Sequence, residues 1–446
     1  MKEPSKEEFD AIVVGTGPGG ATVSRELSQH GKRVLILEWG GNEPVRGKFR
    51  QMSQDCFVPG KSLYITKNLL AMVRAITTGG SSLYYCAHAV DPPLEMLKRY
   101  GVDITKEVEA IKSIVPCAPL RDDLMCQAGK VFLESALELG YDCRKVNKYI
   151  YQDKCREECD LCLLGCPHGA KWTARNFVDD ALESGATIVN RAKVKAVIVE
   201  SGKAVGVRYG HENRRREAYA SKIVLAAGGI GSPLILRQSG IDGVGYDFFF
   251  DPLWFVWGRV DRVTSGRGTP MTARIILPEE GIVLTDHNMP HLTKAIFDIQ
   301  GFKPWKALSF SNMVPIQVKV RDALSGHLGK RGWVWKGLQQ EDWKKLNSGF
   351  DHAKRILENA GARGIYKSPL LAAHPGGTVK IGEHLDADLK TAYDNLYVCD
   401  ASVIPDEMGL PPSLTILSLG KRLSKHLLGL DQCSSAGVAS TAEVLA

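Results

Sequence analysis

The feature that most constrains how this chain can fold is a glycine-rich turn near its N-terminus. The turn, GTGPGG, places glycines at Gly15, Gly17 and Gly20, directly after the apolar run FDAIVVG and directly before a segment with helical spacing over 19–30. The first glycine permits a tight turn, the second lets the backbone approach a pyrophosphate, and the third lets the helix pack closely on the strand. A second apolar run, RVLILE, follows the helix, so the pattern predicts a strand–helix–strand unit that binds a dinucleotide.

The residue that ends the second predicted strand supports this interpretation. Glu38 lies eighteen residues after Gly20, where a carboxylate accepts hydrogen bonds from ribose hydroxyls. An acidic group at this place disfavours a cofactor with a 2′-phosphate. A plain glycine-rich turn is the alternative, and it requires neither the two strands nor the carboxylate.

The length of the chain and a change in its pattern predict two interleaved domains. With 446 residues the chain exceeds one ordinary core. A helix is expected over 62–75, and from about residue 245 the residues alternate as in an antiparallel sheet. The aromatic run over 248–257 suits the wall of an apolar cavity, although an ordinary core is the alternative use of these side chains.

Charge and hydropathy exclude several classes of protein. The formal net charge is +7, from 57 Lys and Arg against 50 Asp and Glu, and no basic tract stands out, so nucleic acid is not an expected partner. The N-terminus shows no apolar signal region, and no stretch of eighteen apolar residues occurs. We therefore expect a cytoplasmic protein without a membrane span.

Four of the eleven cysteines lie within one short segment. Cys155, Cys159, Cys162 and Cys166 follow the pattern C-x3-C-x2-C-x3-C, and a proline comes next. This spacing is close to that of bacterial ferredoxins, and four thiolates so close together can wrap a compact [4Fe–4S] cluster. Zinc is an alternative metal, although a structural zinc site usually takes two separated cysteine pairs, and a loop without metal is the third interpretation. Disulfides are not expected without a secretory context.

Basic residues surround these cysteines. They are Lys154, Arg156, Lys171 and Arg175. Positive charge near an anionic cluster would stabilise its reduced form and raise its potential. The alternative interpretation is a solvated basic face.

Four motifs together resemble the glucose–methanol–choline (GMC) oxidoreductases, a family of FAD enzymes. They are the N-terminal run from FDAIVVG to RVLILEWG, the turn TTGGSS over 77–82, the run KIVLAAGGIGSPLILRQSGI over 222–241, and a C-terminal block that begins HPGGTVKIG over 374–423. The last block is most similar to that of cholesterol oxidase-like members. The resemblance implies an α/β fold class, in which a Rossmann-like FAD-binding domain is interleaved with an antiparallel-sheet substrate domain.

The resemblance also sets the expected domain boundaries. The FAD-binding domain is expected over 1–244, with the cysteine-rich insert at 151–173, and again over 366–430. The substrate domain is expected over 245–365. The remaining residues, 431–446, are small and polar, and they are expected to form a flexible tail.

The same resemblance assigns expected roles to individual residues. Val194 lies where the family contacts adenine, and Asp400 and Ala401 lie where it approaches the ribityl and pyrophosphate of FAD. His374 matches the catalytic histidine of the family. The predicted FAD-binding residues are Gly15, Gly17, Pro18, Gly19, Gly20, Glu38, Gly79, Gly80, Ser81, Ser82, Val194, Ala227, Gly228, Asp400, Ala401 and Pro412.

One position departs from the family pattern. The family usually has a second histidine or an asparagine directly before a proline at the start of its final helix, and Pro411 stands there in this chain. Proline has neither a side-chain acceptor nor an N–H group, so the pair that accepts a substrate proton is incomplete. His374 can act alone, since a neutral imidazole suits a general base near pH 7. Its alternative role is only to hydrogen-bond flavin or water.

These features together predict a flavin-dependent dehydrogenase or reductase. A flavin handles two electrons and an iron–sulfur cluster handles one. Their combination would transfer electrons between an alcohol-like or small apolar substrate and a one-electron acceptor, such as a redox partner protein or a quinone. An oxidase that reduces O₂ directly needs no such relay. The alternative is an electron-transfer subunit of a larger complex, with no organic substrate of its own.

Overall fold

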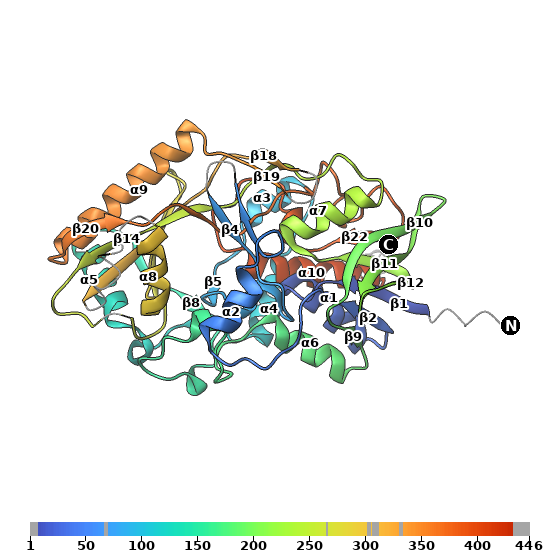
Figure 1. The fold of residues 1–446 in the computed structure, drawn as a ribbon, viewed down its shortest axis with the longest axis horizontal. Coiled ribbons are helices and arrows are strands. Elements are labelled where there is room, and N and C mark those ends of the chain that lie inside the picture. Colours follow the sequence, from blue (N-terminus) through green and yellow to red (C-terminus); the bar gives the residue numbers. More distant parts are fainter. Residues whose placement is uncertain are drawn as a thin grey trace, which may run out of the picture.

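The molecule is elongated, with one β-sheet toward each end of its longest axis (Figure 1). The computed structural model describes residues 8–66, 70–264, 266–300, 305, 312–329 and 333–430. The predicted flexible tail, 431–446, lies outside the described residues.

The first sheet is built around the predicted strand–helix–strand unit. β1 (Glu8–Val14) runs parallel to β2 (Val34–Leu37), and α1 (Pro18–Gln29) connects them. β2 is buried along its whole length, as expected for a strand inside a covered parallel sheet. The other strands are β9 (Thr187–Val189), β10 (Lys193–Glu200), β11 (Lys203–His211), β12 (Arg214–Leu225) and β22 (Leu396–Val398), in the order β10-β11-β12-β1-β2-β9 with β22 beside β12.

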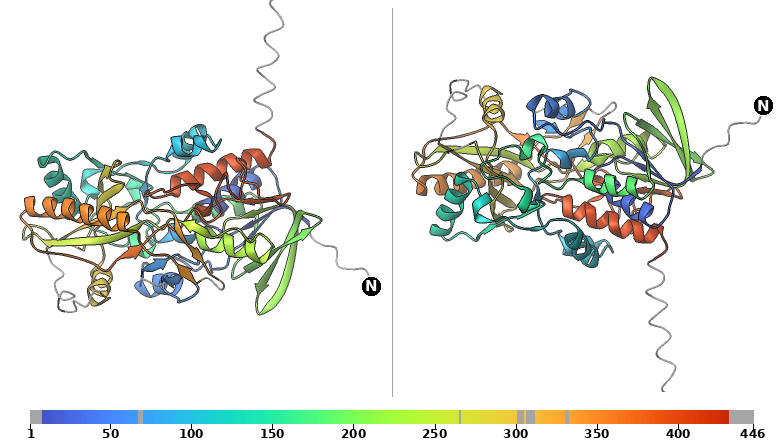
Figure 2. Two further views of the ribbon diagram at one scale, coloured as in Figure 1. Left: turned by 90° about the horizontal axis from the view of Figure 1, so that it is seen from above. Right: turned by 90° about the horizontal axis from the view of Figure 1, so that it is seen from below.

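Helices from distant parts of the chain pack around this unit. α1 packs against α6 (Ala174–Glu183) and against α10 (Ser413–Leu427), while α7 (Gly228–Gln238) follows β12 and packs on β10. Figure 2 shows α10, in red, beside the blue α1 in both views. The C-terminal part of the chain therefore returns to the dinucleotide unit at the N-terminus.

The second sheet is mostly antiparallel. Its strands, in order, are β3 (Leu63–Ile65), β4 (Ala71–Val73), β21 (Leu371–Ala372), β14 (Pro252–Arg259), β17 (Met313–Val320), β16 (Ile282–Asp286), β15 (Ala273–Leu277) and β7 (Cys143–Lys145), with β20 (Arg363–Lys367) beside β14. Three of these strands, β3, β4 and β7, precede the range predicted for the substrate domain.

The two faces of the second sheet have different surroundings. Val256, Leu284 and Val318 belong to an apolar cluster under α5 (Gln127–Glu138) and α9 (Gln340–Asn359). Because successive side chains of a strand alternate between faces, Phe255 and Gln317 point to the opposite face. That second face lines a large cavity.

The prediction of a helix over 62–75 is wrong. β3 and β4 pair antiparallel there, and β4 joins the second sheet by pairing in parallel with β21. Met72 in β4 is fully buried in an apolar cluster. Pairing with a strand about 300 residues later decides this conformation, and a local pattern carries no information about such a partner.

Two small sheets and several short helices complete the described fold. The sheets are β5 (His88–Ala89), β8 (Asn147–Lys148) and β6 (Ala118–Pro119), and β13 (Tyr246–Phe248), β18 (Ser325–Leu328) and β19 (Val334–Trp335). The helices are α2 (Phe49–Cys56), α3 (Leu94–Arg99), α4 (Thr105–Ile114) and α8 (His291–Gln300). Within the described residues, no helix has the length and apolar character needed to cross a membrane.

Candidate active site

One cavity of about 1470 Å³ is lined by residues of both large sheets. It extends from the glycine-rich turn after β1 to the uncovered face of the second sheet. The predicted site residues that line it are Gly15, Gly17, Pro18, Gly19, Glu38, Gly80, Ser81, Ser82, Val194, Ala227, Gly228, His374, Asp400, Ala401 and Pro412. Gly20 and Gly79 lie outside this lining. The fold thus brings together motifs that are separated by up to several hundred residues.

The glycines of the first turn differ in what surrounds them. Gly15 has φ +101°, and a Cβ atom there would lie 2.3 Å from the carbonyl oxygen of Ala226. Gly17 has open space instead, with nothing within 4 Å of an added Cβ. The fold itself therefore requires glycine at the first position. At Gly17 the open backbone suits the close approach of a pyrophosphate at the N-terminus of α1.

The carboxylate of Glu38 is buried and stabilises the glycine-rich turn by accepting hydrogen bonds. Its Oε2 accepts hydrogen bonds from the backbone N–H of Thr16 at 3.1 Å and the Thr16 hydroxyl at 2.6 Å, and its Oε1 accepts one from Gly40 at 2.6 Å. Burial raises the pKa of Glu38, and these hydrogen bonds act against that rise. Thr16 also accepts a hydrogen bond from the N–H of Gly79 at 3.0 Å. Thr16, which no sequence motif singles out, thereby joins the first turn to the second.

Asp400 joins the remaining motifs. Its Oδ2 accepts hydrogen bonds from the N–H of Gly228 at 2.8 Å and the hydroxyl of Ser232 at 2.5 Å, and its Oδ1 accepts one from the N–H of Ser402 at 2.8 Å. A Cβ atom at Gly229 would lie 1.9 Å from the carbonyl oxygen of Pro375. The start of α7 therefore packs directly on the segment that carries the predicted catalytic histidine.

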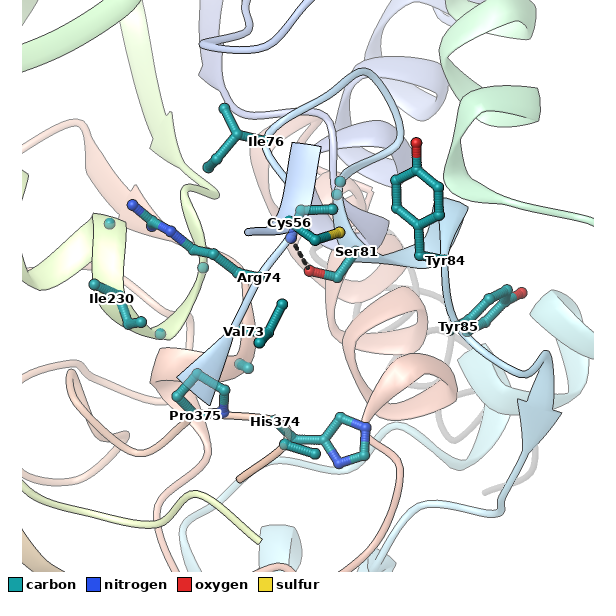
Figure 3. A pocket seen from close by; sticks show the side chains of 18 of the residues that line it. Cys56, Val73, Arg74, Ile76, Ser81, Tyr84, Tyr85, Ile230, His374 and Pro375 are labelled. Atoms are coloured by element: carbon teal, nitrogen blue, oxygen red, sulfur yellow. Dashed lines mark hydrogen bonds between the residues drawn. The ribbon is translucent and has the colours of Figure 1, made fainter. Parts of the chain in front are cut away.

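That histidine, His374, is held by a buried carboxylate. Its Nδ1 lies 3.0 Å from Oδ2 of Asp251, which is completely buried. Asp251 also pairs with Nζ of Lys319 at 3.4 Å, and its Oδ1 accepts a hydrogen bond from the N–H of Gly409 at 3.1 Å. Figure 3 shows the ring of His374 at the cavity, with Tyr85 and Ser81 among the surrounding side chains.

These contacts define the state of the His374 ring. Burial lowers the pKa of His374 below 6.5, the charge of Lys319 acts in the same direction, and Asp251 opposes both. The ring is therefore neutral at pH 7. Since a carboxylate only accepts hydrogen bonds, Nδ1 carries the proton and Nε2 is free to act as a base. Pro411 lines the same cavity and offers no second acceptor.

The wall that the second sheet forms is apolar with a few polar groups. Apolar residues of this wall include Leu253 and Phe255 on β14, Val283 on β16, and Met271 and Met289. Polar residues are Thr285, His287, Gln317 and Lys319. The aromatic run over 248–257 thus serves both predicted purposes, because Leu253 and Phe255 line the cavity while Phe248 and Phe250 lie in an apolar core.

The predicted metal centre is not supported by the structure. Among the described residues, which include all four cysteines of the loop, no group of three or more His, Cys, Asp or Glu side chains is arranged to hold a metal ion. Cys162 lies in the short helical turn Cys162–Leu164 and is buried, which raises the pKa of its thiol to about 12. Cluster and zinc ligands are thiolates, so a metal bound there would displace the proton of this thiol.

Lys171 has a different environment from the one its sequence suggests. Its ammonium group is buried and donates hydrogen bonds to the carbonyl oxygens of Leu83 at 2.8 Å, Tyr85 at 3.0 Å and Cys162 at 2.5 Å. Burial lowers the pKa of Lys171 to about 8. The solvated basic face therefore does not describe it. Lys171 instead connects the cysteine loop to the turn after Gly80.

Comparison with known proteins identifies the family. Two profiles described as GMC oxidoreductase match residues 10–252 and 337–420. The chain therefore belongs to the GMC oxidoreductase family. Similar chains include the uncharacterized protein MJ1450 of Methanocaldococcus jannaschii, which is 26% identical over 94% of this chain and 100% of that protein. The long-chain-alcohol oxidase FAO4A of Arabidopsis thaliana is 22% identical over 93% of this chain and 68% of that protein.

Solved structures share the fold. Pyridoxine 4-oxidase from Mesorbium loti has a TM-score of 0.72 at 15% identity, and covers 94% of this chain and 99% of its own. A formate oxidase of Aspergillus oryzae RIB40, studied for the modification of its FAD, has a TM-score of 0.76 at 14% identity, and covers 97% and 100%. The predicted α/β fold class is thereby confirmed, and the family supports FAD as the cofactor. The closeness to cholesterol oxidase-like members stays a prediction.

Proposed function

We propose that this protein is an FAD-dependent oxidoreductase that oxidises the hydroxyl group of a largely apolar alcohol. The observation that carries the proposal is the neutral imidazole of His374, held by Asp251 at the wall of the same cavity that contains the glycine-rich turn. The apolar residues of the second sheet suit a substrate with an apolar skeleton. A relative named as a long-chain-alcohol oxidase is consistent with this class of substrate.

The residues of the chain divide the chemistry between them. Bound FAD would supply the two-electron acceptor needed to oxidise the alcohol to an aldehyde or ketone. Nε2 of His374 takes the hydroxyl proton. Asp251 keeps the proton of the neutral ring on Nδ1 and stabilises the imidazolium that forms. The apolar wall excludes water from the reacting atoms.

The cofactor can be tested directly. The glycine turn and the carboxylates of Glu38 and Asp400 suit non-covalent FAD. Acid precipitation of the purified protein should release a yellow supernatant in which chromatography identifies FAD. Release of FMN, or no flavin in fresh protein, would contradict the cofactor. Anaerobic mixing with a primary alcohol should then bleach the flavin absorbance, and a flavin that no alcohol reduces would contradict the substrate class.

We also propose that the four-cysteine loop binds a [4Fe–4S] cluster and that the enzyme uses a one-electron acceptor. The ferredoxin-like spacing supports this, as does the position of the loop, because Leu163 between its cysteines lines the cavity. The N–H of Lys171 also lies 3.4 Å from Sγ of Cys166, and such bonds are typical near cluster sulfurs. Metal binding would require Cys162 to lose its proton.

Metal content and oxygen consumption test this second proposal. Anaerobically prepared protein should contain about four iron atoms per chain, and Cys162→Ala should remove the cluster absorbance while sparing FAD. Stoichiometric zinc, or no metal, would overturn it. Since some similar proteins are named as oxidases, turnover with O₂ is the second measurement. Rapid O₂ consumption would contradict a dehydrogenase.

A further inference from the structure

The cavity wall contains polar atoms that no protein group satisfies. In the described part of the chain, both ring nitrogens of His88, Oγ1 of Thr285 and Nδ1 of His287 are buried and have no hydrogen-bond partner. All three residues line the cavity, and they are only 5%, 2% and 6% exposed. Buried polar atoms are nearly always paired, so three such side chains on a largely apolar wall indicate a ligand that pairs with them.

The register of the second sheet places two of these groups in a row that leads away from the catalytic histidine. Lys319, which binds Asp251, pairs with Val283 on β16. Thr285 is two residues further along β16, and His287 is two further again, where its N–H continues the ladder to β17. Side chains two apart share a face at a spacing of about 7 Å, so the row extends roughly 14 Å beyond Lys319.

The unpartnered groups are neutral, which limits the ligand. Burial lowers the pKa of His287 to about 3 and that of His88 well below 6.5, and the charge of Lys148 acts in the same direction on both. The ring of His287 already hydrogen-bonds Gln317, so its Nδ1 can donate or accept one further hydrogen bond, whereas the Thr285 hydroxyl can do both. A ligand hydroxyl matches these groups, because it both donates and accepts.

A carboxylate on the ligand would be less well accommodated. Lys319, the cation at the start of this row, is already paired with Asp251. Arg274 lies opposite Thr285 on β15, but it does not line the cavity. A buried anion without a counter-charge has a large desolvation penalty, which favours a neutral ligand.

We infer that the substrate is a neutral, mainly apolar alcohol with a second hydroxyl group, which Thr285 and His287 bind while the first hydroxyl meets His374. The inference rests on the proposed function and adds the recognition of the far end of the substrate. The chemical class is a long-chain diol or a molecule with two hydroxyls at similar separation.

Anaerobic flavin reduction by three series of compounds tests this inference. The probes are α,ω-diols of roughly six to twelve carbons, to match the length of the row, with primary alcohols and ω-hydroxy acids of equal length. Diols should exceed the matching primary alcohols in kcat/KM by about tenfold, the effect of one or two hydrogen bonds. The hydroxy acids should be the poorest substrates.

Substitutions in this row test which residues produce the preference for diols. Thr285→Val should lower the diol-to-alcohol ratio of kcat/KM by about tenfold. His287→Phe should also lower it, and it keeps a ring beside Phe255, whose centroid lies 4.6 Å from that of His287. The control is Thr415→Val, the same change at a buried unpartnered hydroxyl of α10 outside the cavity lining, which should leave the ratio unchanged.

A binding measurement separates this inference from the proposed function. Dithionite-reduced enzyme cannot oxidise an alcohol, so a diol should raise its Tm more than the matching alcohol does, and Thr285→Val should remove the difference. Equal behaviour of diols and alcohols, a preference for hydroxy acids, or a ratio that Thr285→Val leaves unchanged would overturn the inference alone. If no alcohol reduces the flavin, the proposed function is overturned, and the Tm comparison still decides the inference.

Discussion

Oδ2 of Asp251 lies 3.0 Å from Nδ1 of His374, although 123 positions separate the two residues in the chain. Both residues have positive φ values, 47° and 48°, in a region that residues other than glycine rarely adopt. Such backbone strain persists only where the surrounding structure enforces it, and it is common at functional sites. The contact with Asp251 therefore fixes the orientation of the His374 ring that catalysis requires.

Removal of the His374 ring should slow the step that reduces the flavin. General-base catalysis typically contributes about 10²–10⁴-fold, and His374→Ala should slow flavin reduction by an alcohol by that factor. Reoxidation by an artificial one-electron acceptor should stay near normal. His374→Gln should not restore the rate, since an amide hydrogen-bonds but does not take up a proton. Stopped-flow absorbance measures both steps, at equal FAD occupancy. An unchanged reduction rate would favour the electron-transfer alternative.

The two charged neighbours of His374 should shift its pH dependence in opposite directions. The neutral ring is the active base, so kcat/KM should rise as pH rises through a pKa below 6.5. Asp251 raises that pKa and Lys319 lowers it. Asp251→Asn should therefore move the rising limb to lower pH and also reduce kcat. Lys319→Met should move the limb to higher pH.

Stability measurements must accompany these pH profiles. Asp251 and Lys319 form a buried ion pair, and removal of one partner typically costs about 3–5 kcal/mol. Profiles are therefore compared at a temperature well below each Tm. If the rising limb of kcat/KM moves in the same direction in Asp251→Asn and Lys319→Met, the titrating group is not His374.

The sequence predicted the dinucleotide unit well because the interactions that specify it are local. The tight turn at Gly15, the helix that follows and the carboxylate at Glu38 lie within thirty residues, and each has a distinct pattern. The other motif residues were found through resemblance to the family, and the fold places most of them on one cavity.

The rest of the site could not be predicted, because its contacts are long-range and carry no motif. Asp251 stands within an aromatic run, and only the pairing of β14 with β17 brings Lys319 close to it. Thr285 and His287 follow the alternation of an ordinary strand. The cysteine spacing is a local pattern as well, but the structure buries Cys162 and, among the described residues, arranges no group of three or more side chains to hold a metal ion. A spacing therefore indicates which ligands could meet without showing that they do.

Alanine substitutions at two glycines should separate the needs of the fold from those of the cofactor. Gly15→Ala forces a Cβ to 2.3 Å from the carbonyl of Ala226 at φ +101°, so it should lower the Tm of both apoprotein and holoprotein. Gly17→Ala meets nothing within 4 Å, so the Tm of the apoprotein should change little. Its FAD affinity should still fall, because the added methyl group occupies the approach of the pyrophosphate. Calorimetry and FAD titration test this, and an unchanged affinity in Gly17→Ala would place the pyrophosphate elsewhere.

The neutral state of His287 should make the protein sensitive to acid. Its pKa is lowered to about 3 by burial, whereas an unfolded histidine titrates near 6.5. Between these values the unfolded state binds a proton that the folded state does not, so the free energy of unfolding falls as pH decreases through this window, by up to about 1.4 kcal/mol per pH unit. This stability is fully present above pH 6.5.

The substitution His287→Phe removes this titrating group. It should reduce the slope of the unfolding free energy against pH, between pH 6 and about 4, by the amount that corresponds to one proton, up to about 1.4 kcal/mol per pH unit. Thr285→Val, which changes the same wall without removing a titratable group, should keep the wild-type slope. Urea unfolding at a series of pH values measures it, and a slope unaffected by His287→Phe would contradict the neutral, buried state of this imidazole.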